Sequence, residues 1–385
     1  ARTYSPGSLR PETARALYGA ELHFSSSRID VLAGCRFAHF LQYGLRAQER
    51  EPAEFDSRFY GTFVHDVLEH VVQQTEREGG FAAVPRSRVQ ELAQERMEQN
   101  AQTLLETFPD SGRTGYLLRR TFDEVTQVVD ELYDELSVSA FRPKFCELEF
   151  SARGALPGVA FAGERCRGVV EGFVDRVDVW QSGGRPYVRV VDYKTGKKSF
   201  DYTNVLHGRG LQMLLYLFAL VRQGGHLLHG EPLPAGVLYF PARIERVSVR
   251  DRLAQAEIEK ERRKQLRRSG VLLNSDPVLE AMEPCGGSPR FLPYTLDKEG
   301  RKTGDLASFV QLAQLERFVF QTVAALGDEL ADGRIDPDPC IRDAKDSACA
   351  FCPYSEICAG HEQPRWLKKI TVEEFWQTLE RREHG

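Results

Sequence analysis

Long hydrophobic runs are missing from this chain of 385 residues. Its longest apolar stretch, from Leu211 to Val221, falls well short of the roughly 20 residues that cross a bilayer, so no membrane span is predicted. No repeat with a period of about 20 to 50 residues is visible, which argues against solenoids and propellers. Eight cysteines are too few to build a disulfide fold of this size. The 42% hydrophobic and 28% charged residues fit a globular protein of two or three units, or one large domain with insertions.

An excess of positive charge is also missing, because the formal net charge is -5. This balance argues against a wholesale nucleic-acid coat, so any contact with nucleic acid must rely on local charge. Two basic runs offer it, one with Lys194, Lys197 and Lys198 and one from Arg262 to Arg268. The chain begins at Ala1 without an apolar signal segment, so we expect a cytoplasmic protein and a fragment of something longer.

Hydrophobic periodicity predicts an alternation of helices and strands. The predicted elements are a helix after Gly61, a helical insertion from Arg86 to Ser139, strands at Phe145–Phe150, Val169–Trp180 and Tyr187–Tyr193, a buried helix at Leu211–Val221, a strand at Gly236–Phe240, a charged helix at Asp251–Arg268 and an amphipathic helix at Phe309–Leu330. We expect five segments, namely 1–60, 61–140, 141–245, 246–335 and a cysteine-rich tail at 336–385. The order helix, three strands, helix, strand predicts an α/β core.

Two carboxylates and an amine are predicted to meet at neighbouring strand ends. Side chains alternate across a strand, so Asp192 and Lys194 share one face. Asp175 lies on the preceding strand, and a Gly183-Gly184 turn pairs the two strands antiparallel, which brings Asp175 beside Asp192. Like charges repel unless a cation neutralises them, and hard oxygen ligands suit Mg²⁺ or Mn²⁺.

Phosphodiester hydrolysis needs a metal to orient water and a cation to stabilise the transition state, and Lys194 supplies the latter. The alternative is a surface ion pair between Asp192 and Lys194 on a hairpin, worth only about 0 to 1 kcal/mol. The acid-bearing strand before this pair and the glutamine-bearing apolar helix after it favour the catalytic interpretation.

Four motifs occur in a fixed order along the chain. They are Gly61-Thr62-Phe63-Val64-His65, Glu171-Gly172-Phe173-Val174-Asp175-Arg176-Val177-Asp178, Val191-Asp192-Tyr193-Lys194-Thr195-Gly196 and Gln212-Met213-Leu214-Leu215-Tyr216. Together they resemble RecB-type nucleases of the PD-(D/E)XK superfamily, although Val174 stands where the superfamily name has proline. The resemblance implies a restriction-endonuclease-like αβββαβ core with helical insertions.

The same resemblance implies a role for each matched residue. His65, Asp175 and Asp192 would ligate Mg²⁺ or Mn²⁺ together with the backbone carbonyl of Tyr193, and Lys194 would activate water or stabilise the transition state. In addition, Gln212 and Tyr216 would position the DNA strand, and Glu171 would support the site.

Three cysteines crowd near the C-terminus, as Cys349-x2-Cys352-x5-Cys358. In a reducing compartment this spacing favours metal binding, but a closed tetrathiolate site needs a fourth ligand. Cys340 and Cys35 are the candidates, and spacing alone does not choose between them. A zinc site and thiols without any ligand are the alternatives to an iron-sulfur cluster.

The segments around Cys35 and around Cys349 to Cys358 are similar to those of AddB-type nuclease domains. The matching residues are Ser25-Ser26-Ser27-Arg28-Ile29, Cys35-Arg36-Phe37-Ala38-His39-Phe40, Tyr43-Gly44-Leu45 and Ala350-Phe351-Cys352-Pro353-Tyr354-Ser355-Glu356-Ile357-Cys358. The resemblance implies that Cys35, Cys349, Cys352 and Cys358 hold a 4Fe-4S cluster, a structural staple between the two ends of the domain.

The resemblance implies a metal-dependent exonuclease acting on single-stranded DNA, as the nuclease domain of an AddAB-like helicase-nuclease with a helicase partner. We expect the strand to run past the carboxylates, with Tyr193, Tyr202 or Tyr216 available for stacking. The run from Arg262 to Arg268 would line that path or form a solvated helix face. The alternatives are a free-standing iron-sulfur exonuclease of CRISPR systems and a catalytically silent DNA-binding scaffold.

Overall fold

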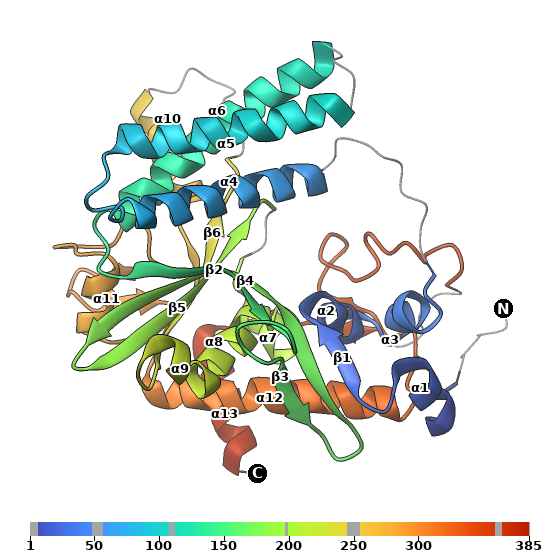
Figure 1. Ribbon diagram of the computed structural model, residues 1–385. Coiled ribbons are helices and arrows are strands. Elements are labelled where there is room, and N and C mark those ends of the chain that lie inside the picture. Colours follow the sequence, from blue (N-terminus) through green and yellow to red (C-terminus); the bar gives the residue numbers. More distant parts are fainter. Residues whose placement is uncertain are drawn as a thin grey trace.

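A mixed β-sheet forms the centre of the computed structural model, which describes residues 7–47, 57–107, 112–196, 199–244, 255–358 and 364–384 (Figure 1). The strand order is β1-β4-β5-β6-β7-β10, and β2 and β3 also pair with β4. These strands are β1 Leu22–Ser25, β2 Arg142–Phe150, β3 Val159–Ala162, β4 Arg167–Ser182, β5 Arg185–Lys194, β6 Leu233–Pro241, β7 Ser269–Leu273 and β10 Leu306–Ala307. The predicted α/β core is confirmed.

Helices cover this sheet on both sides, and two small strand pairs lie apart from it. The helices are α1 Pro11–Tyr18, α2 Ser26–Gly34, α3 Arg36–His39, the π-helical turn Phe40–Gly44, α4 Ser57–Arg77, α5 Arg86–Thr107, α6 Gly112–Leu136, α7 Tyr202–Leu206, α8 Gln212–Gln223, α9 Gly225–Leu228, α10 Gln255–Gln265, α11 Asp276–Met282, α12 Phe309–Ala331 and α13 Val372–His384. The small pairs are β8 Tyr294–Leu296 with β9 Lys302–Gly304 and β11 Cys340–Ile341 with β12 Arg365–Trp366. None of the described helices is long and apolar enough to cross a membrane.

The β4–β5 hairpin fixes the geometry on which the site depends. Gly183 and Gly184 both have positive φ, at 58° and 75°, a conformation that glycine adopts without steric cost in two-residue hairpin turns. The strands then pair antiparallel as far as Arg176 opposite Val191, as the sequence predicts. β5 continues into a parallel pair with β6, and α8 crosses between them and packs against both.

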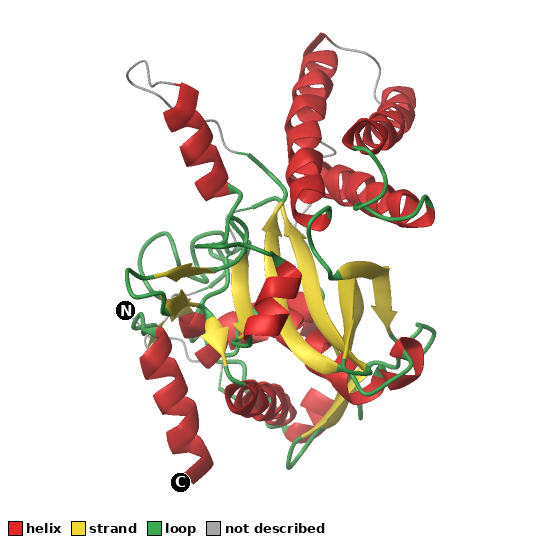
Figure 2. Ribbon diagram, turned by 90° about the vertical axis from the view of Figure 1, so that its left-hand side faces the viewer, coloured by secondary structure: helices red, strands yellow, loops and turns green. Residues whose placement is uncertain are grey.

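Two helical layers enclose the sheet, as both ribbon views show (Figures 1 and 2). On one side α4 lies next to the strands, with α5 and α6 beyond it, whereas α8 and α12 lie on the other side. The inner face of α4 is mainly apolar, because Val64, Val67, Leu68 and Val71 are completely buried. This packing holds α4 over the strands.

A buried network of charged side chains joins the sheet to α6. Asp178 pairs with Arg176 and with Arg189, and Glu135 of α6 pairs with Arg189 and with Arg268. All five side chains are at most 2% exposed. Arg268 therefore corrects one sequence prediction, since this end of the basic run neither lines a DNA path nor faces solvent. A buried ion pair and a solvated charge have the same sequence signature.

Residues near Cys35 pack against the cysteine-rich segment, more than three hundred positions later in the chain. Arg36 pairs with Asp338 at 2.9 Å and also with Glu329 of α12. Arg365 of β12 donates to the carbonyl oxygen of Ala33 at 2.6 Å. These bonds hold the N-terminal helices against the tail.

Candidate active site

Two acidic residues meet where β4 and β5 run side by side. One step beyond the pair of Arg176 and Val191, the antiparallel register places Asp175 opposite Asp192. The backbone N–H of Tyr193 donates to Asp175 Oδ2 at 2.7 Å, which fixes that carboxylate. The structure thus brings together the two strand ends as the sequence predicts.

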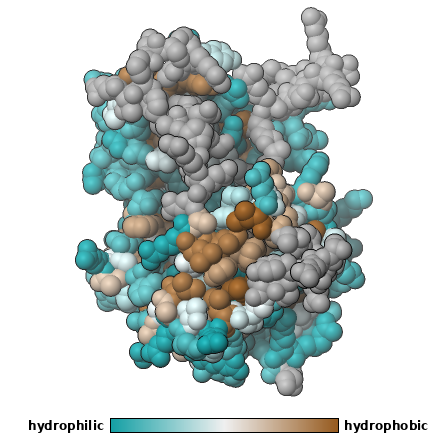
Figure 3. Space-filling model, turned by 90° about the vertical axis from the view of Figure 1, so that its right-hand side faces the viewer, coloured by the Kyte–Doolittle hydropathy of each residue, from teal (hydrophilic) through white to brown (hydrophobic). Residues whose placement is uncertain are grey.

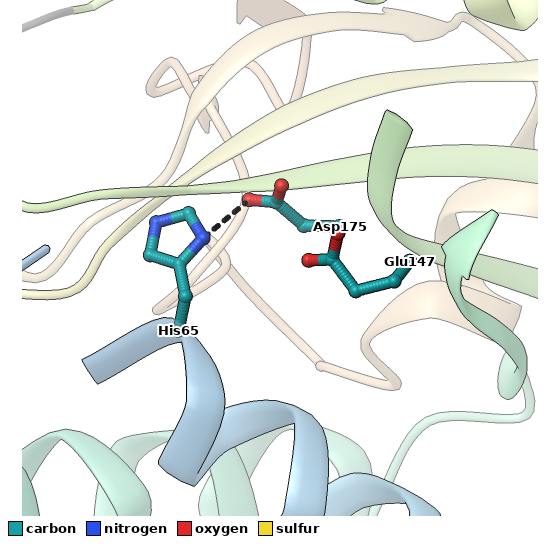
Figure 4. Close-up of side chains that lie close together, drawn as sticks. All are labelled: His65, Glu147 and Asp175. Carbon is teal, nitrogen blue, oxygen red and sulfur yellow. Dashed lines mark ion pairs between the residues drawn. The ribbon is translucent and has the colours of Figure 1, made fainter. Parts of the chain in front are cut away.

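His65 reaches the same point from α4 (Figure 4). Its Nδ1 lies 3.5 Å from Asp175 Oδ2, and its Nε2 lies 2.8 Å from the carbonyl oxygen of Tyr193. A carbonyl oxygen only accepts, so Nε2 carries the proton and the neutral ring turns the lone pair of Nδ1 toward Asp175. Burial lowers the pKa of His65 below its ordinary value and favours this neutral form. A lone pair that faces a carboxylate suits a cation between them.

Glu147 of β2 completes this group, and the sequence prediction missed it. His65, Asp175 and Glu147 each offer one ligand atom, and these atoms lie within 4.8 Å of one another. Glu147 has a φ of 48°, in the left-handed region that costs a residue other than glycine about 1 to 3 kcal/mol. In the sequence it is marked only as an acid inside the predicted strand Phe145–Phe150, and Glu149 is marked in the same way.

The carboxylates repel one another in the absence of a cation. Burial raises the pKa of Asp175 well above its ordinary value, and the charges of Asp192 and Glu147 raise it further. Burial also raises the pKa of Glu147, with Glu69 and Asp192 contributing. The donors are carboxylate oxygens and an imidazole nitrogen. This set fits a divalent cation such as Mg²⁺ or Mn²⁺ and offers no thiolate.

Lys194 stands next to this group at the open end of β5. Its ammonium pairs with Asp192, whose whole residue is only 4% exposed, and lies 5.5 Å from the centre of the Tyr239 ring. Lys194 also lines a cavity of about 340 Å³ together with Arg243 and Arg267. The amine is therefore accessible from this cavity.

The aromatic residues expected to stack on DNA are buried, which corrects that prediction. Tyr193 is 3% exposed, Tyr202 is 7% and Tyr216 is 1%. Tyr193 accepts a hydrogen bond from Arg176 Nη1 at 2.9 Å, and Tyr216 stacks on Phe150 with ring centres 4.9 Å apart. None of these three rings is accessible to a nucleobase.

The remaining predicted site residues lie around this centre. Gln212 is the half-buried first residue of α8, and its side chain makes no hydrogen bond to any residue that the structure describes. Glu171 pairs with His23 at 3.4 Å, and its carbonyl accepts from the Tyr216 hydroxyl at 3.4 Å. Both residues flank the carboxylate group without entering the set of His65, Glu147 and Asp175.

Four cysteines gather elsewhere, around a cavity of about 200 Å³. Cys35, Cys349, Cys352 and Cys358 all line it. Burial raises the pKa of Cys35 to about 11 and also raises the pKa of Cys349, so both thiols are protonated near neutral pH and a bound metal would have to displace their protons. Cys340 does not line the cavity, because its Sγ is buried 3.3 Å from the carbonyl oxygen of Ala33.

Two acids on neighbouring strands of a mixed sheet, with a lysine two residues after one of them, are the arrangement expected of a nuclease fold, and comparison with known families agrees. The family model described as the PD-(D/E)XK nuclease superfamily matches residues 23–359, so the chain belongs to this superfamily.

Among curated proteins, the chain is similar to several that are named as subunits of an ATP-dependent helicase/deoxyribonuclease. It is 34% identical to the one from Moorella thermoacetica over 361 residues, which is 92% of this chain and 31% of the relative. It is 29% identical to the one from Thermoanaerobacter sp. over 381 residues, or 95% of this chain and 33% of the relative. The chain thus spans about a third of the length of these relatives.

Proposed function

We propose that this chain is a Mg²⁺- or Mn²⁺-dependent exonuclease that hydrolyses phosphodiester bonds of single-stranded DNA. The observation that carries the proposal is the convergence of His65, Glu147 and Asp175, from three separate elements, beside the pair of Asp192 and Lys194. Three acids and a lysine in partial burial are costly for stability and suit the hydrolysis of a charged phosphodiester.

Each residue has a specific role in this proposal. Asp175, Asp192 and the Nδ1 atom of His65 would hold the cation, with Glu147 as a further oxygen ligand. The carbonyl oxygen of Tyr193, which the resemblance implies as a ligand, accepts from Nε2 on the other side of the same ring and would orient His65 instead. When bound, the cation would polarise the scissile phosphate and lower the pKa of a water molecule. Lys194 would place its positive charge where negative charge develops on the phosphate.

The backbone fixes two of these ligands before any substrate arrives. Asp175 is held by the N–H of Tyr193, and His65 is held by the carbonyl oxygen of the same residue. One peptide segment of β5 therefore orients both side chains, so little reorganisation is required when a phosphate enters.

We also propose that Cys35, Cys349, Cys352 and Cys358 bind a 4Fe-4S cluster. Four thiols around one cavity supply the ligand set that such a cluster needs. The cluster would close a loop of more than three hundred residues and hold the tail against α2 and α3. The bonds of Arg36 and Arg365 already set this arrangement, so the cluster would act as a structural staple.

The names of the relatives extend the proposal to a larger assembly. Because they are called helicase/deoxyribonuclease subunits, we propose an AddAB-like complex in the cytoplasm. There a helicase partner would unwind DNA from a double-strand end and deliver a single strand to this site, in the course of break repair.

The direct test is degradation of end-labelled single-stranded DNA by the chain in the presence of Mg²⁺. We expect Asp192→Ala and Lys194→Ala to abolish cutting, because one removes a cation ligand and the other the amine. Asp276→Asn is the matched control, since its side chain is 82% exposed and lies on α11, apart from the site. Equal cutting by all four proteins would refute the catalytic assignment, and no cutting by any of them would favour the silent scaffold.

A further inference from the structure

Three neighbouring cavities lie between Lys194 and the cysteines, and together we call them the trough. The cavity beside Lys194 shares Ser199 and Tyr239 with a second cavity of about 310 Å³. The second cavity shares Cys35 and Cys352 with the cysteine cavity. A polymer that enters at the lysine can therefore follow the surface to the segment between Cys349 and Cys352.

Most of the charged side chains that line the trough are cationic. Arg243 and Arg267 line the end near Lys194, and Arg209 lines the second cavity. Arg267 directs its guanidinium hydrogen bonds to the carbonyl oxygens of Leu292 and Tyr294, which leaves its charge in place.

The acids of the same trough are bonded to other groups of the protein. Asp201 caps α7 through the N–H groups of Thr203 and Asn204, and it also pairs with Arg342 at 2.9 Å. Asp30 accepts from the N–H of Gly210 at 2.7 Å. These two acids keep their negative charge, and Arg209 also pairs with Asp346 at 3.8 Å. Lys194, Arg209, Arg243 and Arg267 outnumber the two acids, so the lining is positive on balance and suits a phosphate backbone.

Phe351 projects into solvent beside the second cavity of this trough. Phe351 is 94% exposed, the highest value among the exposed large hydrophobic residues that the structure describes. It lines the second cavity and lies between Cys349 and Cys352, where the N–H of Cys352 donates to the carbonyl oxygen of Cys349 at 3.3 Å. Figure 3 shows apolar side chains gathered on the face that carries the N-terminal helices and the cysteine segment.

An aromatic ring held in water by a short turn is suited to stack on another flat ring. A single strand exposes one base per phosphate, and stacking on an aromatic side chain stabilises each base by about 1 to 3 kcal/mol. The buried rings of Tyr193, Tyr202 and Tyr216 do not offer such a surface. Phe351 is the aromatic residue that lies both on the trough and in solvent among the described residues.

We infer that Phe351 is a stacking platform for a nucleobase of the bound single strand, at a fixed distance from the scissile phosphate. The inference rests on the proposed function, because it takes the carboxylate site as the point where the strand is cut. It assigns the cysteine-bearing loop a role in holding DNA, in addition to a role as a staple. The cationic trough that leads to it favours a nucleic-acid strand over a protein partner at this position.

The test measures binding separately from cutting. Asp192→Asn is used as the parent, so that oligonucleotides stay intact, and single-stranded DNA carries one 2-aminopurine at successive positions. In the parent we expect one position near the cysteine loop to be quenched. Phe351→Ala should abolish that quenching and weaken binding about 5- to 150-fold, which corresponds to the loss of one stacked base. Phe351→Trp should retain both signals.

Ile357→Ala is the matched control, because this residue is 65% exposed on the same segment but lines none of the three cavities. Iron content and visible absorbance of each variant show whether the cysteine segment has kept its structure. Equal affinity and quenching for the parent and Phe351→Ala would overturn the inference even if the wild-type chain cuts DNA. The opposite result, Phe351-dependent binding by a chain that never cuts, would support the inference and overturn the proposed function. Equal losses in Phe351→Ala and Ile357→Ala would also overturn it.

Discussion

The buried carboxylate of Glu135 offers a stability test whose size follows from the structure. Its two oxygens lie 2.9 Å from Arg189 and 2.8 Å from Arg268, and the carboxylate side chain is 2% exposed. Glu135→Gln keeps the shape of the side chain but removes the charge that faces two buried guanidinium groups. Loss of one partner from a buried ion pair costs about 3 to 5 kcal/mol. That is a large part of the roughly 5 to 15 kcal/mol by which proteins are stable.

The pH dependence supplies an independent magnitude. Burial alone would raise the pKa of Glu135, but Arg268 and Arg189 lower it from 4.5 to about 2. Because the folded-state pKa is below the unfolded value, the stabilisation is present above about pH 4.5 and is lost as the pH falls toward about 2. The difference of 4.5 − 2 = 2.5 pH units corresponds to about 3 kcal/mol.

Urea unfolding followed by tryptophan fluorescence measures both effects. We expect Glu135→Gln to lower the free energy of unfolding near neutral pH and to flatten its decline below about pH 4.5. Glu91→Gln is the control, because its side chain is 62% exposed and its pair with Arg88 contributes at most about 1 kcal/mol. If Glu135→Gln unfolded like Glu91→Gln, with the parent's pH slope, the interpretation of the network as a stabilising element would be wrong.

Three further predictions concern the site and the staple. Tyr193→Phe removes the hydroxyl that accepts from the buried guanidinium of Arg176 but keeps the backbone carbonyl and N–H that hold His65 and Asp175. We therefore expect a lower thermal midpoint with an unchanged Mg²⁺ concentration for half-maximal cutting, and a changed Mg²⁺ dependence would contradict this. Cys35→Ser should lose iron and lower the thermal midpoint, whereas Cys285→Ser, which is remote from the cysteine cavity, should keep both; equal iron in the two variants would exclude Cys35 as a ligand. In Gly172→Ala the added Cβ would lie 2.1 Å from the Tyr216 hydroxyl, at a backbone φ of 155°. Calorimetry should therefore show a loss of at least about 1 to 3 kcal/mol in the free energy of unfolding. Gly286→Ala is the control and should show no such loss, because the space around Gly286 is open.

The sequence predicts the core of this fold because period and length identify its elements. β2, β4, β5, α8 and β6 follow the predicted order, and the Gly183-Gly184 turn fixes the register that brings Asp175 to Asp192. The short strand β1 is not predicted, because four residues carry too little pattern. Its parallel pairing with β4 joins segments almost 150 positions apart in the chain, as Leu22 opposite Gly168 shows.

The parts that sequence reasoning gets wrong depend on three-dimensional burial. Arg268 has the sequence signature of a solvated basic run, yet Glu135 and Glu131 of α6 draw it into the interior. Tyr216 falls within a motif of the resembled family, and only the stack on Phe150 shows that its ring faces the core. Glu147 is indistinguishable from Glu149 in the sequence until its left-handed φ turns it toward His65 and Asp175.

The central claim is that Asp175 and Asp192 share one divalent cation. Mn²⁺ binding to the folded chain, followed by electron paramagnetic resonance, tests it most directly without any DNA. The account predicts that the wild-type chain binds Mn²⁺ and that Asp175→Asn and Asp192→Asn each lose most of the affinity while circular dichroism stays unchanged. Undiminished Mn²⁺ binding in both folded variants would contradict it.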